Sequence, residues 1–195
     1  MKKLVLIAIA AFGAMQANAQ LSINPEVGVN FAQTNANGDK FLTGLKAGAV
    51  ADIDIAKGFY IQPGLLYSMK GWKAEGLGAT SKVQLNYLEI PLSLGYRYDF
   101  GNAGGIFATA GPYLGIGLNG KSTATVAGIS ADVDMKAGKD FERLDWGMNL
   151  SVGYISPIGV YIRGQYGMGF SNVYSNTKNR VLGVSIGYAF QLNER

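Results

Sequence analysis

The sequence contains neither cysteine nor histidine. Without cysteine the chain can form no disulfide and no thiolate metal site. Without histidine it lacks the Ser-His-Asp and Cys-His catalytic arrangements and the usual zinc ligands. We therefore expect a protein without catalytic activity, cofactor or bound metal.

Net charge and long apolar runs are also scarce. When Lys2 and Lys3 are left out, 15 basic and 13 acidic side chains remain, and this small surplus argues against a nucleic-acid partner. No apolar run after residue 19 is long enough for a transmembrane helix. Yet 48% of the residues are hydrophobic and only 15% are charged. An exported chain of this composition needs a large soluble core or a lipid-facing surface built from strands.

The first 19 residues have the pattern of a secretory signal peptide. Lys2 and Lys3 form a basic start, residues 4–14 are apolar, and Ala17-Asn18-Ala19 matches a cleavage site. We expect residues 1–19 to be the signal peptide and residues 20–195 to form one barrel domain. A membrane anchor is the alternative, but this apolar stretch is too short to span a bilayer.

The last apolar segment has two different faces. From Leu182 to Leu192 every second residue is bulky and apolar, whereas the residues between are Gly183, Ser185, Gly187, Ala189 and Gln191. Side chains of a strand alternate between its faces, so this segment is a two-faced strand. Its small and polar face could not fill a soluble core, which suggests that lipid lies against the apolar face.

The same alternation recurs in eight segments: 23–31, 45–55, 59–69, 87–98, 106–118, 145–154, 160–170 and 182–192. Short connections (56–58, 99–104 and 156–159) alternate with long ones (34–43, 71–82, 121–144 and 171–179), as in outer-membrane barrels. Aromatic residues gather near both predicted ends, which favours two interfacial girdles. The sequence predicts an all-β fold, an eight-stranded antiparallel up-and-down transmembrane β-barrel in the bacterial outer membrane, with short turns in the periplasm.

Three prolines interrupt this pattern. Pro63, Pro91 and Pro112 lie inside predicted strands. Proline removes a ladder hydrogen bond, and a closed barrel offers no edge strand to hold it. We expect local bulges, unpaired carbonyls or strand breaks at these positions.

Residues 87–98 read Tyr-Leu-Glu-Ile-Pro-Leu-Ser-Leu-Gly-Tyr-Arg-Tyr. With Gly28-Val29-Asn30, residues 61–65 and the final Gly187-Tyr188-Ala189-Phe190, this segment resembles the outer-membrane β-barrel family that includes PorT-like proteins, often labelled porin-family. The resemblance implies an eight-stranded barrel like the Omp-X and Omp-A transmembrane domains. It also implies outer-membrane lipid around the barrel and the barrel-assembly machinery as a partner during biogenesis.

Eight charged residues fall on the small, polar faces of the predicted strands: Glu26, Lys46, Asp52, Lys70, Glu89, Arg97, Asp145 and Arg163. In a barrel surrounded by lipid these side chains point into the lumen, which in an eight-stranded barrel is filled by side chains. Both signs are present, so the charges can pair and share hydrogen bonds. We predict an ion-paired plug, and a gated ion path is the alternative.

Residues 115–122 match the phosphate-binding pattern G-x-x-x-x-G-K-[ST] and contain G-x-G-x-x-G. Such loops bind phosphate where a strand leads into a helix. Here residues 123–129 are β-branched or small, so we interpret the match as part of a strand. The following segment contains Asp132, Asp134 and Asp140 but no complete calcium loop, and we expect a solvated external loop.

These patterns favour a structural or adhesive outer-membrane protein that presents its loops to an extracellular or envelope partner. A small passive pore for ions or small solutes is the main alternative, although open channels usually need more strands. A soluble lipocalin-like carrier is a weaker alternative, because its interior would be apolar and its surface polar.

Overall fold

The computed structural model describes residues 20–192 except 37, 77 and 174–176. The predicted signal peptide, residues 1–19, therefore lies outside the described residues. In the described part of the chain no helix has the length and apolar character needed to cross a membrane.

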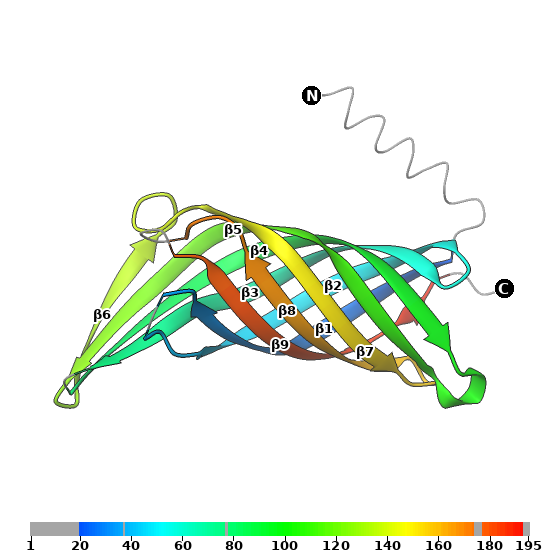
Figure 1. Cartoon of the computed structure of the whole chain (residues 1–195), viewed down its shortest axis with the longest axis horizontal. Helices are drawn as coiled ribbons and strands as arrows, with labels where there is room; N and C mark the ends of the chain where they lie inside the picture. The colour runs from blue at the N-terminus through cyan, green and yellow to red at the C-terminus, as the bar shows by residue number, and fades with distance from the viewer. Residues whose placement is uncertain (1–19, 37, 77, 174–176, 193–195) are drawn as a thin grey trace, which may run out of the picture.

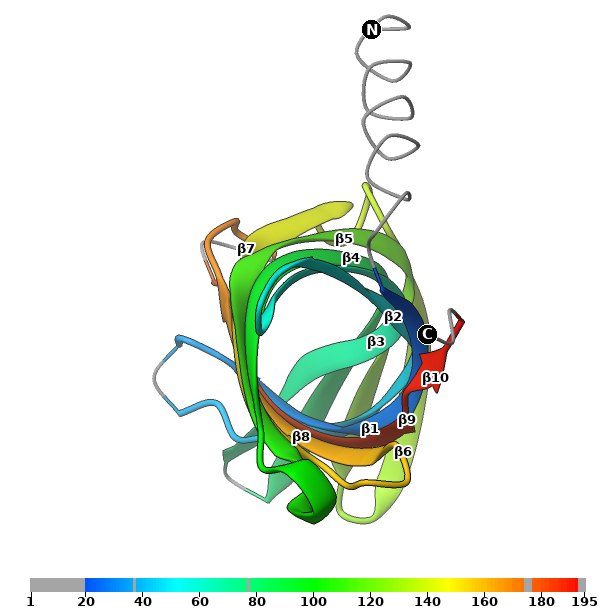
Figure 2. The same cartoon turned by 90° about the vertical axis from the view of Figure 1, so that its right-hand side faces the viewer.

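Eight long antiparallel strands form a closed ring (Figures 1 and 2). They are β1 (Leu21–Thr34), β2 (Leu42–Ala56), β3 (Phe59–Gly76), β4 (Ala79–Asp99), β5 (Gly105–Val126), β7 (Leu144–Ile155), β8 (Val160–Gly169) and β9 (Asn179–Tyr188). Each strand pairs with its neighbour in sequence around the ring, and β9 pairs with β1 to close it. The predicted eight-stranded up-and-down barrel is confirmed.

Two further strands and one short helix lie outside the eight-stranded ring. β6 (Ile129–Lys136) pairs with the end of β5 and projects beyond the barrel (Figure 1). β10 (Phe190–Gln191) pairs with the start of β1, and η1 (Gly101–Ala103) lies in the β4–β5 turn. Following the rule for outer-membrane barrels, we assign the end with the short turns to the periplasm and the end with β6 to the exterior.

The two faces of each strand differ as the alternation predicts. On β9, Leu182, Val184 and Ile186 are exposed on the outside of the barrel, whereas Ser185 between them is buried. Rings meet at both ends: Phe59 packs against Tyr96 in a tilted arrangement near the periplasmic turns, and Trp146 packs edge-on against Phe170 near the outer end. The apolar band and the aromatic girdles therefore face the surrounding lipid.

Two predicted loops are instead extensions of strands. Residues 71–82 were expected as a loop, but β3 and β4 continue through most of them and pair as far as Gly76 and Ala79. Residues 121–144 were expected as a solvated loop, but β5 continues to Val126 and pairs with β6. Outside the membrane both faces can meet water, so lipid does not impose on these strands the contrast that marks the barrel. The β3–β4 register continues unchanged from the barrel, whereas the β4–β5 register shifts between Asn86 and Tyr87.

The three prolines do not break their strands. Pro63, Pro91 and Pro112 lie within β3, β4 and β5, and none of them shifts the register. Instead, the β3–β4 ladder lacks pairs between Pro63 and Leu66, and the β4–β5 ladder lacks pairs between Pro91 and Leu94. The expected loss of pairing is present, whereas the expected bulges and breaks are wrong at these positions. The flanking ladder pairs hold the register where the proline N–H is missing.

The phosphate-loop match at residues 115–122 lies within β5, which continues to Val126 without a helix. Pairing with β4, β6 and β7 occupies this segment. Its interpretation as strand is confirmed, and the backbone does not form the strand–loop–helix cradle that holds phosphate.

Candidate functional site

All eight predicted charges lie on the inward face of the barrel. Seven are buried, and the side chain of Arg97 is 19% exposed. Four are cations and four are anions, so the set carries no net charge. Each of the eight takes part in at least one ion pair with another member of the set.

Lys70 is the centre of the outer part of this network. Its Nζ lies 2.8 Å from Glu89 Oε2 and 3.0 Å from Asp145 Oδ2. The same ammonium group lies 4.1 Å from the ring centroid of Tyr113, a distance suited to a cation–π contact. One cation therefore serves two buried carboxylates.

Neutral partners satisfy the two carboxylates further. Asn149 donates its amide to Glu89 at 3.0 Å. Asp145 accepts hydrogen bonds from Ser171 and Asn179, each at 3.0 Å. These bonds offset part of the cost of holding two anions away from water.

Glu26 is the centre of the second part of the network. Its carboxylate lies 2.8 Å from Lys46 Nζ and 3.4 Å from Arg163 Nε. Tyr161 donates its hydroxyl to the same carboxylate at 3.0 Å. Here two cations serve one anion, so the excess charge is opposite to that around Lys70.

A glutamine links this second group to the periplasmic end. Arg163 donates to Gln62 Oε1 at 2.8 Å, and Gln62 donates its amide to Asp52. Asp52 lies 3.6 Å from Arg97, which also lies 3.6 Å from Asp54. The contacts of Arg97 are longer than those of the buried cations, in keeping with its partial exposure.

A small apolar core covers the outer mouth of the lumen. Phe141, from the segment between β6 and β7, packs edge-on against Tyr87 at a centroid distance of 6.0 Å. Val83 and Leu85 complete the buried cluster, and Trp72 packs against it. This core and the Lys70 group place buried side chains in the outer half of the barrel.

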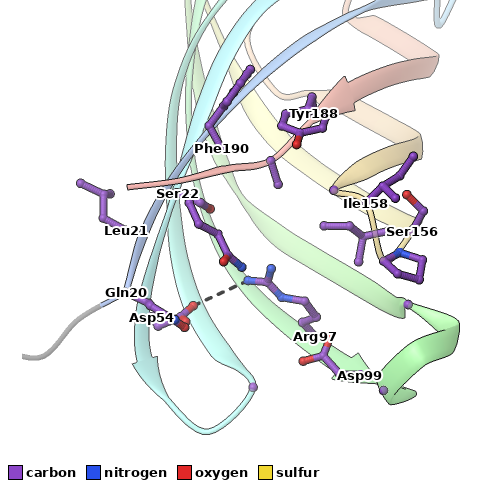
Figure 3. Close-up of a pocket in the computed structure, with 18 residues that line it drawn as sticks. Gln20, Leu21, Ser22, Asp54, Arg97, Asp99, Ser156, Ile158, Tyr188 and Phe190 are labelled. Atoms are coloured by element: carbon purple, nitrogen blue, oxygen red, sulfur yellow. Dashed lines mark ion pairs between the residues drawn. The ribbon is translucent and has the colours of Figure 1, made fainter. Parts of the chain in front are cut away.

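The periplasmic mouth is open. A vestibule of about 800 Å³ lies there, and Arg97, Asp54 and Asp99 are among its lining residues (Figure 3). Further in, a void of about 10 Å³ lies between Asn24, Asp52 and Arg163, with room for about one water molecule. The lumen therefore narrows from an open vestibule to a void that has room for about one water molecule.

The outer sheet consists of the projecting parts of β3, β4, β5 and β6, residues 72–76, 79–86, 119–126 and 129–136. Its inward face carries the core that contains Val83 and Trp72. Its outward face is polar, with Asn86 donating to Asn119 and Thr123 donating to Asp132. β5 is the one strand paired with β6 among the described residues.

The eight charged residues of the lumen were predicted from the sequence, but their uncharged hydrogen-bond partners were not. Gln62 bonds to two of the eight charged residues, and Asn149 and Tyr161 each bond to one of them. All three share the inward parity of their strands, so the same alternation could have identified them. The closing role of Phe141 has no comparable signal, because this residue lies outside any alternating segment.

A closed ring with an apolar exterior and an ion-paired interior defines a transmembrane β-barrel of the outer-membrane type. A family profile described as "Outer membrane protein beta-barrel domain" matches residues 15–175, which is more than half of the chain. The chain belongs to this family, and the protein lies in the bacterial outer membrane. The match does not specifically support the PorT-like branch. Among curated proteins no sequence matches this chain significantly.

Several solved structures are similar to this one at low sequence identity. Ail of Yersinia pestis, in complex with the heparin analogue sucrose octasulfate, has a TM-score of 0.50 and 12% identity over 89% of this chain and 99% of its own. Neisserial surface protein A has a TM-score of 0.48 and 13% identity, covering 87% and 97%. OprG of Pseudomonas aeruginosa has a TM-score of 0.46 and 16% identity, covering 91% and 97%. At such identities the likeness to Ail supports the fold alone. The buried charges of the lumen and the exposed apolar side chains of the exterior argue against the lipocalin-like carrier, which would be apolar inside and polar outside.

Proposed function

We propose that this protein is a non-catalytic barrel, anchored by outer-membrane lipid, that displays its outer sheet to an extracellular partner. One observation carries the proposal: the outer half of the lumen holds the buried Lys70 ion pairs and the buried core around Phe141, and we infer that these side chains close it. A closed lumen leaves the external surface as the part that can act on another molecule. We further propose that the barrel-assembly machinery inserts the chain.

The free edge of β6 supports this display role. β6 is exposed along almost its whole length, and Ile129 and Val133 are among its most exposed apolar side chains. An unpaired strand edge offers backbone donors and acceptors to an added strand. The acidic Asp132 and Asp134 are the only charged side chains between Ile129 and Met135, and this favours a partner segment with basic residues.

Adherence of living cells tests the display role. Bacteria expressing the full chain are compared with bacteria expressing a variant in which residues 124–131 are replaced by Asn-Gly. We expect the native protein to promote adherence to immobilised extracellular glycoproteins, or between cells, and the variant to lose it. A heat-dependent gel shift confirms that the shortened barrel still folds. Equal adherence of the two strains would contradict the proposal.

A small passive pore is the second candidate, and the open periplasmic vestibule favours it. Recording from the purified barrel in planar bilayers separates the two functions. We expect no steady current, because side chains fill the lumen between the vestibule and the outer mouth. Steady, reproducible conductance steps would replace the display role with the pore.

A further inference from the structure

Three lysines form a row across the outward face of the outer sheet. Lys73 lies on β3, Lys82 on β4 and Lys121 on β5. Lys73 and Lys82 are directly opposite each other in the β3–β4 ladder. Lys82 faces Thr123 on β5, so Lys121 is its diagonal neighbour, at about 7 to 8 Å for such positions. We call these three residues the lysine row.

The two flanking lysines have carboxylate partners. Glu75 pairs with Lys73 and also with Lys40. Lys121 lies 3.4 Å from Asp132. Hydrogen bonds from Thr123 and Lys121 lower the pKa of the Asp132 carboxyl, so this group remains negative at neutral pH. The charge of each flanking lysine is therefore at least partly neutralised within the protein.

The central lysine has no such partner. Lys82 is exposed, and no carboxylate of the described residues lies within 4.0 Å of its ammonium group. Like charges directly opposite each other on a sheet are destabilising. Glu75 offsets part of this repulsion through its ion pair with Lys73, and an anion beside Lys82 would offset the remainder.

The direction of the row indicates where that anion comes from. The lysine row continues the lipid-facing side of the same strands, which carries Tyr67 and Met69 on β3 and Ile90 on β4. The row therefore faces sideways over the surrounding lipid, beyond the outer end of the apolar band. Lysine stems can lie along apolar surface while the ammonium groups reach the headgroup level.

We propose that Lys82, flanked by Lys73 and Lys121, binds a phosphate group of a phosphorylated glycolipid in the outer leaflet. A compact ammonium group suits phosphate as a point charge. Clusters of basic residues next to a membrane-spanning segment recognise anionic lipid headgroups in the same way. The site would hold individual lipid molecules against the β3–β5 side of the barrel.

Native mass spectrometry of the purified full chain in detergent tests the proposal. The probes are phosphorylated lipid A, the same lipid A without its phosphates, and phosphatidylcholine. We expect wild-type protein to retain phosphorylated lipid A in preference to the other two. Lys82→Gln should reduce this retention roughly fivefold, about the contribution of one basic side chain at an anionic surface.

Lys57→Gln is the matched control, because Lys57 is an exposed lysine in the periplasmic β2–β3 turn. It removes the same charge and should leave lipid A retention unchanged. A heat-dependent gel shift checks that both variants fold. Equal retention by Lys82→Gln and wild type would overturn the proposal. Displacement of lipid A by inorganic phosphate at equal concentration would assign the site to a soluble anion instead and would also overturn it.

Discussion

The outer sheet continues three strands of the barrel, β3, β4 and β5, yet its charged side chains are paired differently from those of the lumen. Lys70 and Lys73 are three residues apart on β3. The side chain of Lys70 is 3% exposed and lies between two carboxylates, whereas that of Lys73 is 30% exposed and shares Glu75 with Lys40. Burial makes pairing obligatory, whereas an exposed lysine such as Lys82 has no carboxylate partner among the described residues and can bind a ligand.

The difference follows from the cost of desolvation. An isolated ion away from water is expensive, so every buried lumen charge has an opposite charge within hydrogen-bonding reach or close to it. Water screens the charges of the outer sheet, and pairs there contribute little to stability. The lumen should therefore govern the stability of the barrel, and the outer sheet should govern what the barrel binds.

The largest expected effect comes from removing the central lumen cation. Lys70→Met leaves Glu89 and Asp145 buried without a cation, which should lower the free energy of unfolding by about 3 to 5 kcal/mol. Lys121→Met removes an exposed cation from the outer sheet and should leave the unfolding midpoint unchanged within error. Urea unfolding of both variants in lipid vesicles measures the comparison. Similar midpoints for the two variants would break the distinction between the two regions.

A second prediction sharpens the comparison within the lumen. Glu89→Ala removes a buried partner of Lys70 and the acceptor of Asn149, and should cost about 3 kcal/mol. Arg97→Ala removes a partly exposed cation whose pairs are 3.6 Å long, and should cost about 1 kcal/mol. Thermal unfolding in detergent measures which of the two variants loses more stability. Unchanged stability of both variants would refute the ion-paired plug.

Much of the barrel could be predicted because lipid and lumen impose opposite demands on alternate residues. Leu182, Val184 and Ile186 on one side of β9 and Ser185 on the other show this contrast directly. The same parity placed charges such as Glu26 and Arg163 in the lumen. Their identity as partners could not be predicted, since it depends on the stagger between β1 and β8, two strands apart around the ring.

The alternation of β6 could have been recognised in the sequence, whereas its pairing in an outer sheet could not. In β6, apolar side chains at every second position (Ile129, Ala131, Val133, Met135) alternate with polar ones (Ser130, Asp132, Asp134, Lys136), which is the period of a strand. β6 is exposed along almost its whole length, so burial of one face does not fix its register. The sheet also depends on the Phe141 core, which joins Val83 on β4 to a residue outside any regular strand.

The smallest expected effect tests whether the outer sheet is independent of the barrel. Ala127 has φ of 50° and Gly128 has φ of 81° in the turn between β5 and β6, and positive φ at both positions is characteristic of a type I′ hairpin. Alanine is strained in this region and glycine is not, so Ala127→Gly should stabilise the hairpin locally by less than about 1 kcal/mol. Hydrogen exchange should slow at Thr125 and Ser130, which pair across the turn, while the global unfolding midpoint stays the same. A matching rise in the global midpoint would show that the outer sheet and the lumen unfold as one unit.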